Sequence, residues 1–387
     1  MHSRSGHFSS LVLIGLLLAL AACSAMGIKT TPEATVATAT RLAAVPPPMA
    51  TMPSPVPTPL LAPARYRLRA GELILASEKD DIPAIFAEDD LFVDAAAGSA
   101  EWEADELVIG VAVGDEARAY PVRLLSLHEV VNDTVGGRPL LITWCPLCFS
   151  AIVFDRTVDG RALTFGVSGY LFKNNLVMYD HQSNTLWSQL LGQPIKGGFH
   201  DEQLVPVPSL LTTWGEWRAL HPGTQILSAA RLGKRAEEIV DPYAGYYGSG
   251  AAGIAGEESG DERLKGKALV VGLAHGDTAR AYPLETVRAA GVINDRLGPV
   301  PLLLLYDATL QSVLAYQRQT SGQTLTFVAA DRPGVVQDVE TGSLWEMATG
   351  RAVAGPLAGE RLARQAAPLV FWFAWSDLHP EAEIFSH

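Results

Sequence analysis

The chain has 387 residues, enough for two or three domains with buried cores. Hydrophobic residues make up 48% and charged residues 18%, a composition that excludes a chain disordered along its whole length. The formal charge of −13, without a long Lys/Arg run, excludes a nucleic-acid surface driven by counterion release. The three cysteines are too few for a fold built on disulfides.

The N-terminus is typical of an export signal. Arg4 precedes an apolar run at residues 11–22, which suits a signal peptide better than a membrane span. The run ends in small residues followed by Cys23, an arrangement that resembles a bacterial lipobox. We therefore expect lipidation of Cys23 and an extracytoplasmic lipoprotein anchored to a membrane of the cell envelope. The alternative is an ordinary secretory cleavage site with an incidental cysteine.

The segment after Cys23 is rich in proline, alanine and threonine. Nine prolines fall between Ser24 and Arg65. This composition predicts a disordered, extended linker without regular secondary structure.

The rest of the chain contains an internal repeat. Residues 106–121 and 268–283, aligned at an offset of 162, are identical at 11 of 16 positions. The same offset pairs Arg156 with Arg318, and after a four-residue shift the register continues toward the C-terminus. Two tandem homologous units are therefore expected. The predicted domains are a signal peptide (1–22), a lipidated linker (23–65), a first unit (66–250) and a second, degenerate unit (251–387).

Within each copy the pattern predicts an α+β fold that is mainly β. Turn signals at Gly114 and Gly160 separate short apolar runs. The expected strands of the first copy are 107–113, 117–120, 140–144, 152–154, 162–168 and 175–179. The expected helices are 121–131 and 214–220.

A Cys-Pro-Leu-Cys motif, Cys145 to Cys148, follows directly on the expected buried strand at 140–144. The second copy lacks both cysteines, and it also lacks the nearby His128. The aligned residues there are Asp307, Leu310 and Ala290. Because all three differ together, we expect Cys145, Cys148 and His128 to form one functional site.

Three interpretations of this site remain open. The first is a non-catalytic binding module with a structural disulfide. A disulfide suits an exported protein, but closing so short a loop stabilises the fold only slightly. A thiol/disulfide redox enzyme would use Cys145 and Cys148 as its catalytic pair. The strand-like residues 149–155 after the motif argue against a thioredoxin fold, in which a helix would follow.

The leading hypothesis is soft-metal binding. Two thiolates and the imidazole of His128 are ligands that suit zinc or copper, and they leave one position of a tetrahedral site to fill. The fourth ligand would be Met178 or His181, with His200, Glu129 and solvent as further alternatives. The sequence identifies neither the metal nor a substrate, and it names no protein partner.

Several motifs in a fixed order also resemble one family. They are His128-Glu129-Val130-Val131-Asn132-Asp133, Trp144-Cys-Pro-Leu-Cys148, Phe165-Gly-Val-Ser-Gly169, Leu186-Trp-Ser-Gln189 and Asp241-Pro-Tyr243. Over about residues 80–250 the chain is similar to the bacterial family catalogued as domain of unknown function 3179. The resemblance implies an exported or lipid-anchored protein and no particular reaction. Trp144 and Phe149 depart from the usual pattern, and Phe149 is expected to narrow access to Cys148.

Overall fold

The computed structural model describes residues 61–386 except 88, 255–259 and 321. The predicted signal peptide, Cys23 and the linker up to residue 60 lie outside the described residues. The described chain is mostly β, as predicted, and its helices are short. All of it belongs to one compact unit, Pro53–His387.

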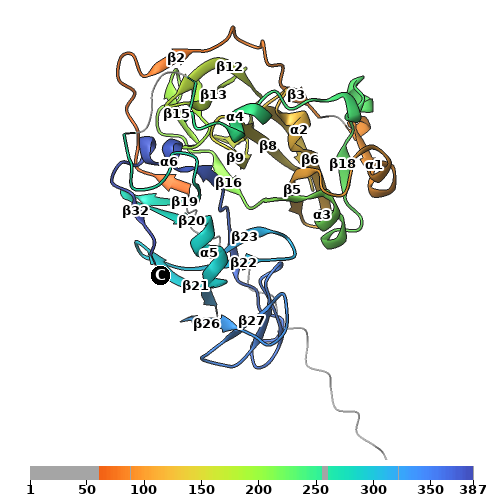
Figure 1. Cartoon of the computed structure of the whole chain (residues 1–387), viewed down its shortest axis with the longest axis vertical. Coiled ribbons are helices and arrows are strands. Elements are labelled where there is room, and N and C mark those ends of the chain that lie inside the picture. Colours follow the sequence, from red (N-terminus) through yellow and green to blue (C-terminus); the bar gives the residue numbers. More distant parts are fainter. Residues whose placement is uncertain (1–60, 88, 255–259, 321, 387) are drawn as a thin grey trace, which may run out of the picture. The chain divides into compact units, whose positions relative to one another are not determined.

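The first half of the described chain forms three five-stranded sheets (Figure 1). One has the order β17 (Leu210–Thr213), β5 (Leu107–Val113), β6 (Glu116–Pro121), β18 (Gln225–Leu227), β4 (Phe92–Asp94). The second has β16 (Val205–Val207), β9 (Ser150–Asp155), β8 (Arg138–Cys145), β7 (Val130–Val135), β3 (Ile85–Phe86). The third has β15 (Gln193–Lys196), β14 (Leu186–Ser188), β13 (Asn175–Asp180), β12 (Phe165–Phe172), β2 (Leu73–Leu75).

The second half also forms three sheets of four or five strands. In one, β19 (Leu269–Gly276) pairs with β31 (Leu369–Phe371) and β20 (Thr278–Pro283), and β20 pairs with β32 (Glu383–Ile384). Another has the order β21 (Val292–Leu297), β22 (Val300–Asp307), β23 (Ser312–Gln317), β30 (Ala363–Gln365). The last has β26 (Phe327–Ala329), β27 (Val335–Asp338), β28 (Leu344–Glu346), β29 (Arg351–Ala354).

Short elements complete the described chain. The α-helices are α1 (Ala95–Glu101), α2 (Val122–Leu125), α3 (Trp214–Leu220), α4 (Ala244–Gly248), α5 (Leu284–Ala290) and α6 (Trp372–Leu378). The 3-10 helices are η1 (Asp89–Leu91), η2 (Ala230–Leu232) and η3 (Ala236–Glu238). The small hairpins are β10 (Thr157–Val158) with β11 (Arg161–Ala162), and β24 (Gln319–Thr320) with β25 (Gln323–Thr324). None of the described helices is long and apolar enough to cross a membrane.

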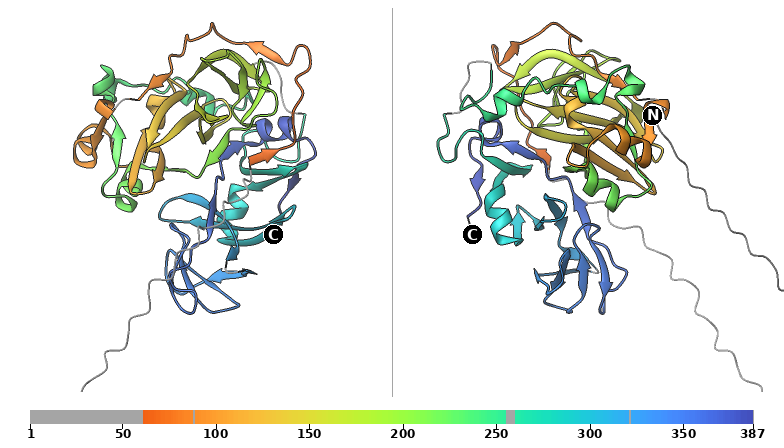
Figure 2. Two further views of the ribbon diagram at one scale, coloured as in Figure 1. Left: turned by 180° about the vertical axis from the view of Figure 1, so that it is seen from behind. Right: turned by 45° about the vertical axis from the view of Figure 1, so that its right-hand side comes forward.

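Two predicted boundaries differ from the structure. The helix expected at 121–131 ends at Leu125, because Val130 and Val131 are buried in β7 and pair with β8. Strand pairing between β7 and β8 therefore decides the conformation of these residues, although the spacing of the preceding leucines predicts a helix. The linker expected to reach Arg65 ends earlier, since β1 (Leu61–Pro63) pairs in parallel with β19. Figure 2 shows this orange strand beside the teal strands of the second half.

A buried ion cluster joins the sheet of β5 to that of β7. Asp133 accepts hydrogen bonds from Arg118 at 2.6 Å and from the Tyr120 hydroxyl at 2.5 Å. In the second half Asp295 accepts the corresponding bonds from Arg280 at 2.6 Å and from the hydroxyl of Tyr282 at 2.8 Å. The Asp133 side chain is 1% exposed and that of Asp295 is 18% exposed.

The two helices near the ends of the halves pack in the same way. Trp217 of α3 lies against Gly110, where an added Cβ would come within 2.3 Å of the indole. Trp375 of α6 lies against Gly272 at the same 2.3 Å. Both strands therefore require glycine at this position, because any side chain would displace a buried tryptophan.

The halves hold each other at equivalent turns. The Phe371 amide donates to the Cys148 carbonyl at 2.8 Å, and the Thr212 hydroxyl donates to the Leu310 carbonyl at 2.7 Å. Buried side chains of both halves also share the same apolar clusters.

We predict that Asp133→Ala lowers the free energy of unfolding more than Asp295→Ala does. The first change removes the buried carboxylate from Arg118, which keeps only the more exposed Glu116 at 2.9 Å, and should cost about 3 kcal/mol. The second change affects a partly solvated pair and leaves Arg280 its exposed partner Glu383, so it should cost about 1 kcal/mol. Urea unfolding followed by tryptophan fluorescence measures both. Equal losses would show that burial does not set the strength of this cluster.

Candidate functional site

The Cys-Pro-Leu-Cys motif forms the turn between β8 and β9. Cys145 is the last residue of β8 and pairs with Ser150, the first residue of β9. Phe149 closes the turn with a positive φ of 53°, and its amide donates to the Pro146 carbonyl at 3.3 Å. Both cysteines are free thiols, and they are 1% and 0% exposed.

Cys148 belongs to a buried polar network. Its thiol donates to the carbonyl of Asn174 at 3.1 Å, and the side-chain amide of Asn175 lies 3.6 Å from its sulfur. Asn175 also donates to the side-chain oxygen of Gln189 at 2.8 Å, and Ser150 donates to the same oxygen at 2.9 Å. The network fixes the sulfur of Cys148 within an apolar core.

The two thiols have opposite acidities. Burial works to raise the pKa of Cys145, but hydrogen bonds from Cys148, from the backbone of Leu176 and from Asn175 lower it below its usual value. Burial, together with the hydrogen bond and charge of Cys145, raises the pKa of Cys148 well above its usual value. The site therefore favours an anion on Cys145 and a proton on Cys148.

Aromatic side chains cover the turn. The Phe149 ring contacts Trp144, Tyr247 and Phe371, with ring centroids 5.2 to 5.6 Å apart. The hydroxyl of Tyr246, in α4, donates to the Leu147 carbonyl at 2.9 Å. In Figure 1, α4 lies over the end of the sheet that contains β8 and β9. The expectation that Phe149 narrows access agrees with its place in this cover.

His128 does not join the thiols in a metal site. Its Nδ1 lies 2.7 Å from the Pro83 carbonyl, which can only accept, so Nδ1 carries the proton. Its Nε2 is buried and has no hydrogen-bond partner among the described residues. Burial lowers the pKa of His128, which keeps the ring neutral.

The proposed fourth ligands also have other surroundings. Met178 is a fully buried residue of β13, opposite Trp187. His181 contacts the hydroxyl of Tyr179 through Nε2 at 3.1 Å and packs beside Phe86. Within the described part of the chain, no three His, Cys, Asp or Glu side chains form a group that could hold a metal ion. We therefore do not assign Cys145, Cys148 or His128 as metal ligands.

Glu129 is a site residue that the sequence analysis considered only as a fourth ligand. It is 7% exposed and has a positive φ of 58°. Burial raises the pKa of its carboxyl well above the usual value, and the charge of Cys145 raises it further. Both effects favour the protonated form of the Glu129 carboxyl. The sequence signal that marks it is that the residue 162 positions later in the chain, Gly291, is a glycine.

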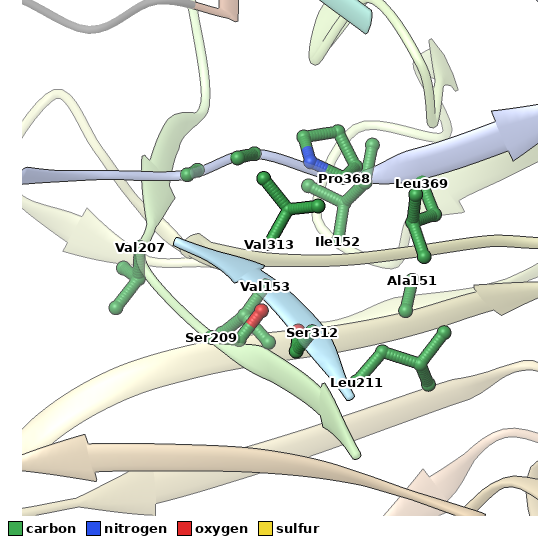
Figure 3. Close-up of a pocket in the computed structure, with 12 residues that line it drawn as sticks. Ala151, Ile152, Val153, Val207, Ser209, Leu211, Ser312, Val313, Pro368 and Leu369 are labelled. Atoms are coloured by element: carbon green, nitrogen blue, oxygen red, sulfur yellow. The ribbon is translucent and has the colours of Figure 1, made fainter. Parts of the chain in front are cut away.

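Figure 3 shows a different pocket, enclosed by strands of both halves. Its walls include Ile152 and Val153 of β9, Val207 of β16, Val313 of β23 and Leu369 of β31. The enclosed volume of about 20 Å³ has room for about one water molecule. This pocket is therefore a packing gap and too small for a substrate.

The fold and the site define a mostly β protein with a buried, free Cys-X-X-Cys pair. The chain belongs to the family described as Protein of unknown function (DUF3179), whose model matches residues 79–382. The match extends beyond residue 250, where the motif resemblance ends, and so includes both halves. No curated protein and no solved structure matches the chain.

We predict that Tyr246→Phe speeds alkylation of the two thiols by a small reagent such as iodoacetamide. The change removes the hydroxyl that donates to the Leu147 carbonyl and accepts the Gly253 amide at 2.9 Å. Loss of the bond to the turn, worth about 1 kcal/mol, should raise the rate about fivefold. Tyr247→Phe is the matched control, because the Tyr247 ring also packs on Phe149 but its hydroxyl makes no hydrogen bond to the turn of Cys145 and Cys148. Equal rates in both variants would mean that Tyr246 does not hold the turn.

Proposed function

We propose that this chain is a membrane-anchored thiol/disulfide exchange protein with Cys145 as nucleophile and Cys148 as resolving thiol. The observation that supports this most is the opposite acidity of two adjacent, buried and free thiols. A purely structural pair has no need of such asymmetry, whereas disulfide exchange needs one thiolate and one thiol.

We also infer that the two halves are copies of one unit. The strand order β31-β19-β20-β32 corresponds to β17-β5-β6-β18, and the orders of the other sheets correspond in the same way. The ion clusters of Asp133 and Asp295 support the inference, as do the Trp–Gly contacts of α3 and α6. On this basis His128, Glu129, Cys145 and Cys148 have counterparts at the sequence offset of 162, which are Ala290, Gly291, Asp307 and Leu310.

The counterpart of Cys145 supports its role as a thiolate. Asp307 occupies this position in the second half, and its carboxylate accepts the amides of Thr309 at 2.9 Å and Leu310 at 3.1 Å. A turn of the same kind therefore binds an anion through backbone amides in the second half. In the first half the backbone amide of Cys148 lowers the pKa of Cys145.

The proposed reaction is the reduction of a substrate disulfide. The Cys145 thiolate attacks one sulfur, forms a mixed disulfide and releases the first thiolate of the substrate. Cys148 then attacks the Cys145 sulfur, which forms the Cys145–Cys148 disulfide and releases the second thiol with the proton that Cys148 gave up. Two electrons pass from the dithiol to the substrate, and the reverse sequence oxidises a substrate dithiol.

The N-terminal sequence supports the location. A short apolar signal that ends at Cys23, followed by a proline-rich linker, suits a lipoprotein whose folded part stands outside the cytoplasm. Disulfides persist in such a compartment, so a substrate of this class is available there.

Titration of the thiolate absorbance at 240 nm in single variants tests the proposal. The pKa of Cys145 in Cys148→Ser should lie below the pKa of Cys148 in Cys145→Ser, because the backbone of Leu176 and the side chain of Asn175 still favour the Cys145 thiolate, while burial still raises the pKa of Cys148. The wild-type pair should also equilibrate with glutathione at a measurable potential, and the double Cys→Ser variant should not.

The same preparations test the metal hypothesis by elemental analysis. The proposal would be overturned in favour of soft-metal binding by two results together. The wild-type protein would hold stoichiometric zinc or copper that either single variant loses, and it would not exchange with glutathione. A disulfide that glutathione cannot reduce, and whose loss lowers the melting temperature, would overturn it in favour of a structural bridge.

A further inference from the structure

Glu129 lies at the junction of α2 and β7, directly beside the thiol site. Its amide donates to the Leu125 carbonyl at 2.7 Å, and its carbonyl accepts the amide of Trp144, the neighbour of Cys145, at 2.8 Å. Its φ of 58° is in the left-handed region, which a residue with a Cβ rarely adopts. Strain of this kind persists where it serves a function.

The second half builds the same junction with glycine. Gly291 has a φ of 68°, its amide donates to the Val287 carbonyl at 2.9 Å, and its carbonyl accepts the amide of Tyr306 at 3.0 Å. These are the same bonds at the sequence offset of 162. Glycine can therefore make these backbone bonds without strain. In the first half the same position carries a carboxyl side chain at the cost of an unfavourable φ.

The side chain of Glu129 is 7% exposed, and its backbone bond to Trp144 places the residue beside the strand end that carries Cys145. Its charge acts on Cys148 and on the Tyr243 hydroxyl, and the charge of Cys145 acts on it.

The Glu129 carboxyl makes no hydrogen bond to any residue that the structure describes. Two further charged groups act near this cluster: Asp241 acts on Tyr243 and Tyr247, and Lys234 acts on His128, the residue before Glu129. An acid without a structural partner, buried beside two thiols, is placed to exchange protons with them.

We propose that Glu129 is the proton-transfer residue of the Cys145–Cys148 pair. The inference rests on the proposed function. It identifies the group that donates and accepts the proton that disulfide exchange must move. In the reduced protein Glu129 is a carboxylic acid beside the Cys145 thiolate. When that thiolate attacks a substrate disulfide, the first leaving thiolate takes the proton of Glu129.

The second step uses the same carboxyl in reverse. The Glu129 carboxylate accepts the proton of Cys148 as Cys148 attacks the Cys145 sulfur, and it passes this proton to the second leaving thiolate. One dithiol, present as thiolate and thiol, and one carboxylic acid thus become a protein disulfide and a carboxylate. The substrate disulfide becomes two thiols, so protons, charge and electrons balance.

Two small reagents separate proton transfer from a structural role. Hydroxyethyl disulfide releases a basic thiolate that needs a proton, whereas methyl methanethiosulfonate releases a sulfinate that needs none. Glu129→Gln keeps the shape of the side chain and removes the acid. It should slow exchange with hydroxyethyl disulfide about 10²-fold, remove the loss of rate at high pH, and leave the thiosulfonate reaction within about threefold.

Glu129→Gly supplies the backbone control. It introduces the residue that the second half uses, so the melting temperature should not fall, while exchange with hydroxyethyl disulfide should slow as in Glu129→Gln. Equal slowing with both reagents would show a structural role and overturn the proposal, as would full rates in either variant. If the wild-type protein does not react with hydroxyethyl disulfide at all, the proposed function itself fails.

Discussion

The thiol site depends on hydrogen bonds that hold the turn after β8 from outside its own hairpin. The carbonyl of Cys148 accepts the amide of Phe371 in β31, and the carbonyl of Leu147 accepts the hydroxyl of Tyr246 in α4. The thiol of Cys148 donates to the Asn174 carbonyl in the loop between β12 and β13. Because these partners are distant in the sequence, the acidity of the thiols is a property of the folded chain.

The second half lacks the cysteines, but it contributes a hydrogen bond to the turn that contains them. It supplies Phe371 to the first turn, and the first half supplies Thr212 to the Leu310 carbonyl of the second turn. In the second turn the side chain of Asp307 accepts two backbone amides at the position that Cys145 has in the first turn. A carboxyl group cannot exchange disulfides, so in the function that we propose the first half carries the reaction and the second half supports its turn.

The sequence predicted the β framework closely because short apolar runs bounded by glycine turns leave few alternatives. The strand Leu107–Val113 and the helix Trp214–Leu220 have the predicted bounds. The helix at 121–131 was too long because periodicity within the segment cannot reveal that Val130 pairs with β8. Only the folded chain shows which partner strand a buried valine meets.

Only part of the candidate site could be predicted from the sequence. Comparison of the two similar sequence segments selected Cys145, Cys148 and His128 together. The structure places the two cysteines in one turn, whereas the His128 ring bonds to the Pro83 carbonyl. Glu129 differs from the second copy as well, but its meaning depends on φ and on burial, which the sequence does not contain.

Burial of both thiols sets a limit on how they react. Exposing them requires the cover of Tyr246 and Phe149 to move, and breaking the Tyr246 and Phe371 hydrogen bonds to the turn would cost about 2 kcal/mol. Such a cost leaves the turn open in about 3% of molecules, and exchange slows by that fraction. Irreversible oxidation of the Cys145 thiolate slows by the same fraction. For the function that we propose, a closed resting state would protect the Cys145 thiol from oxidation and would still permit turnover.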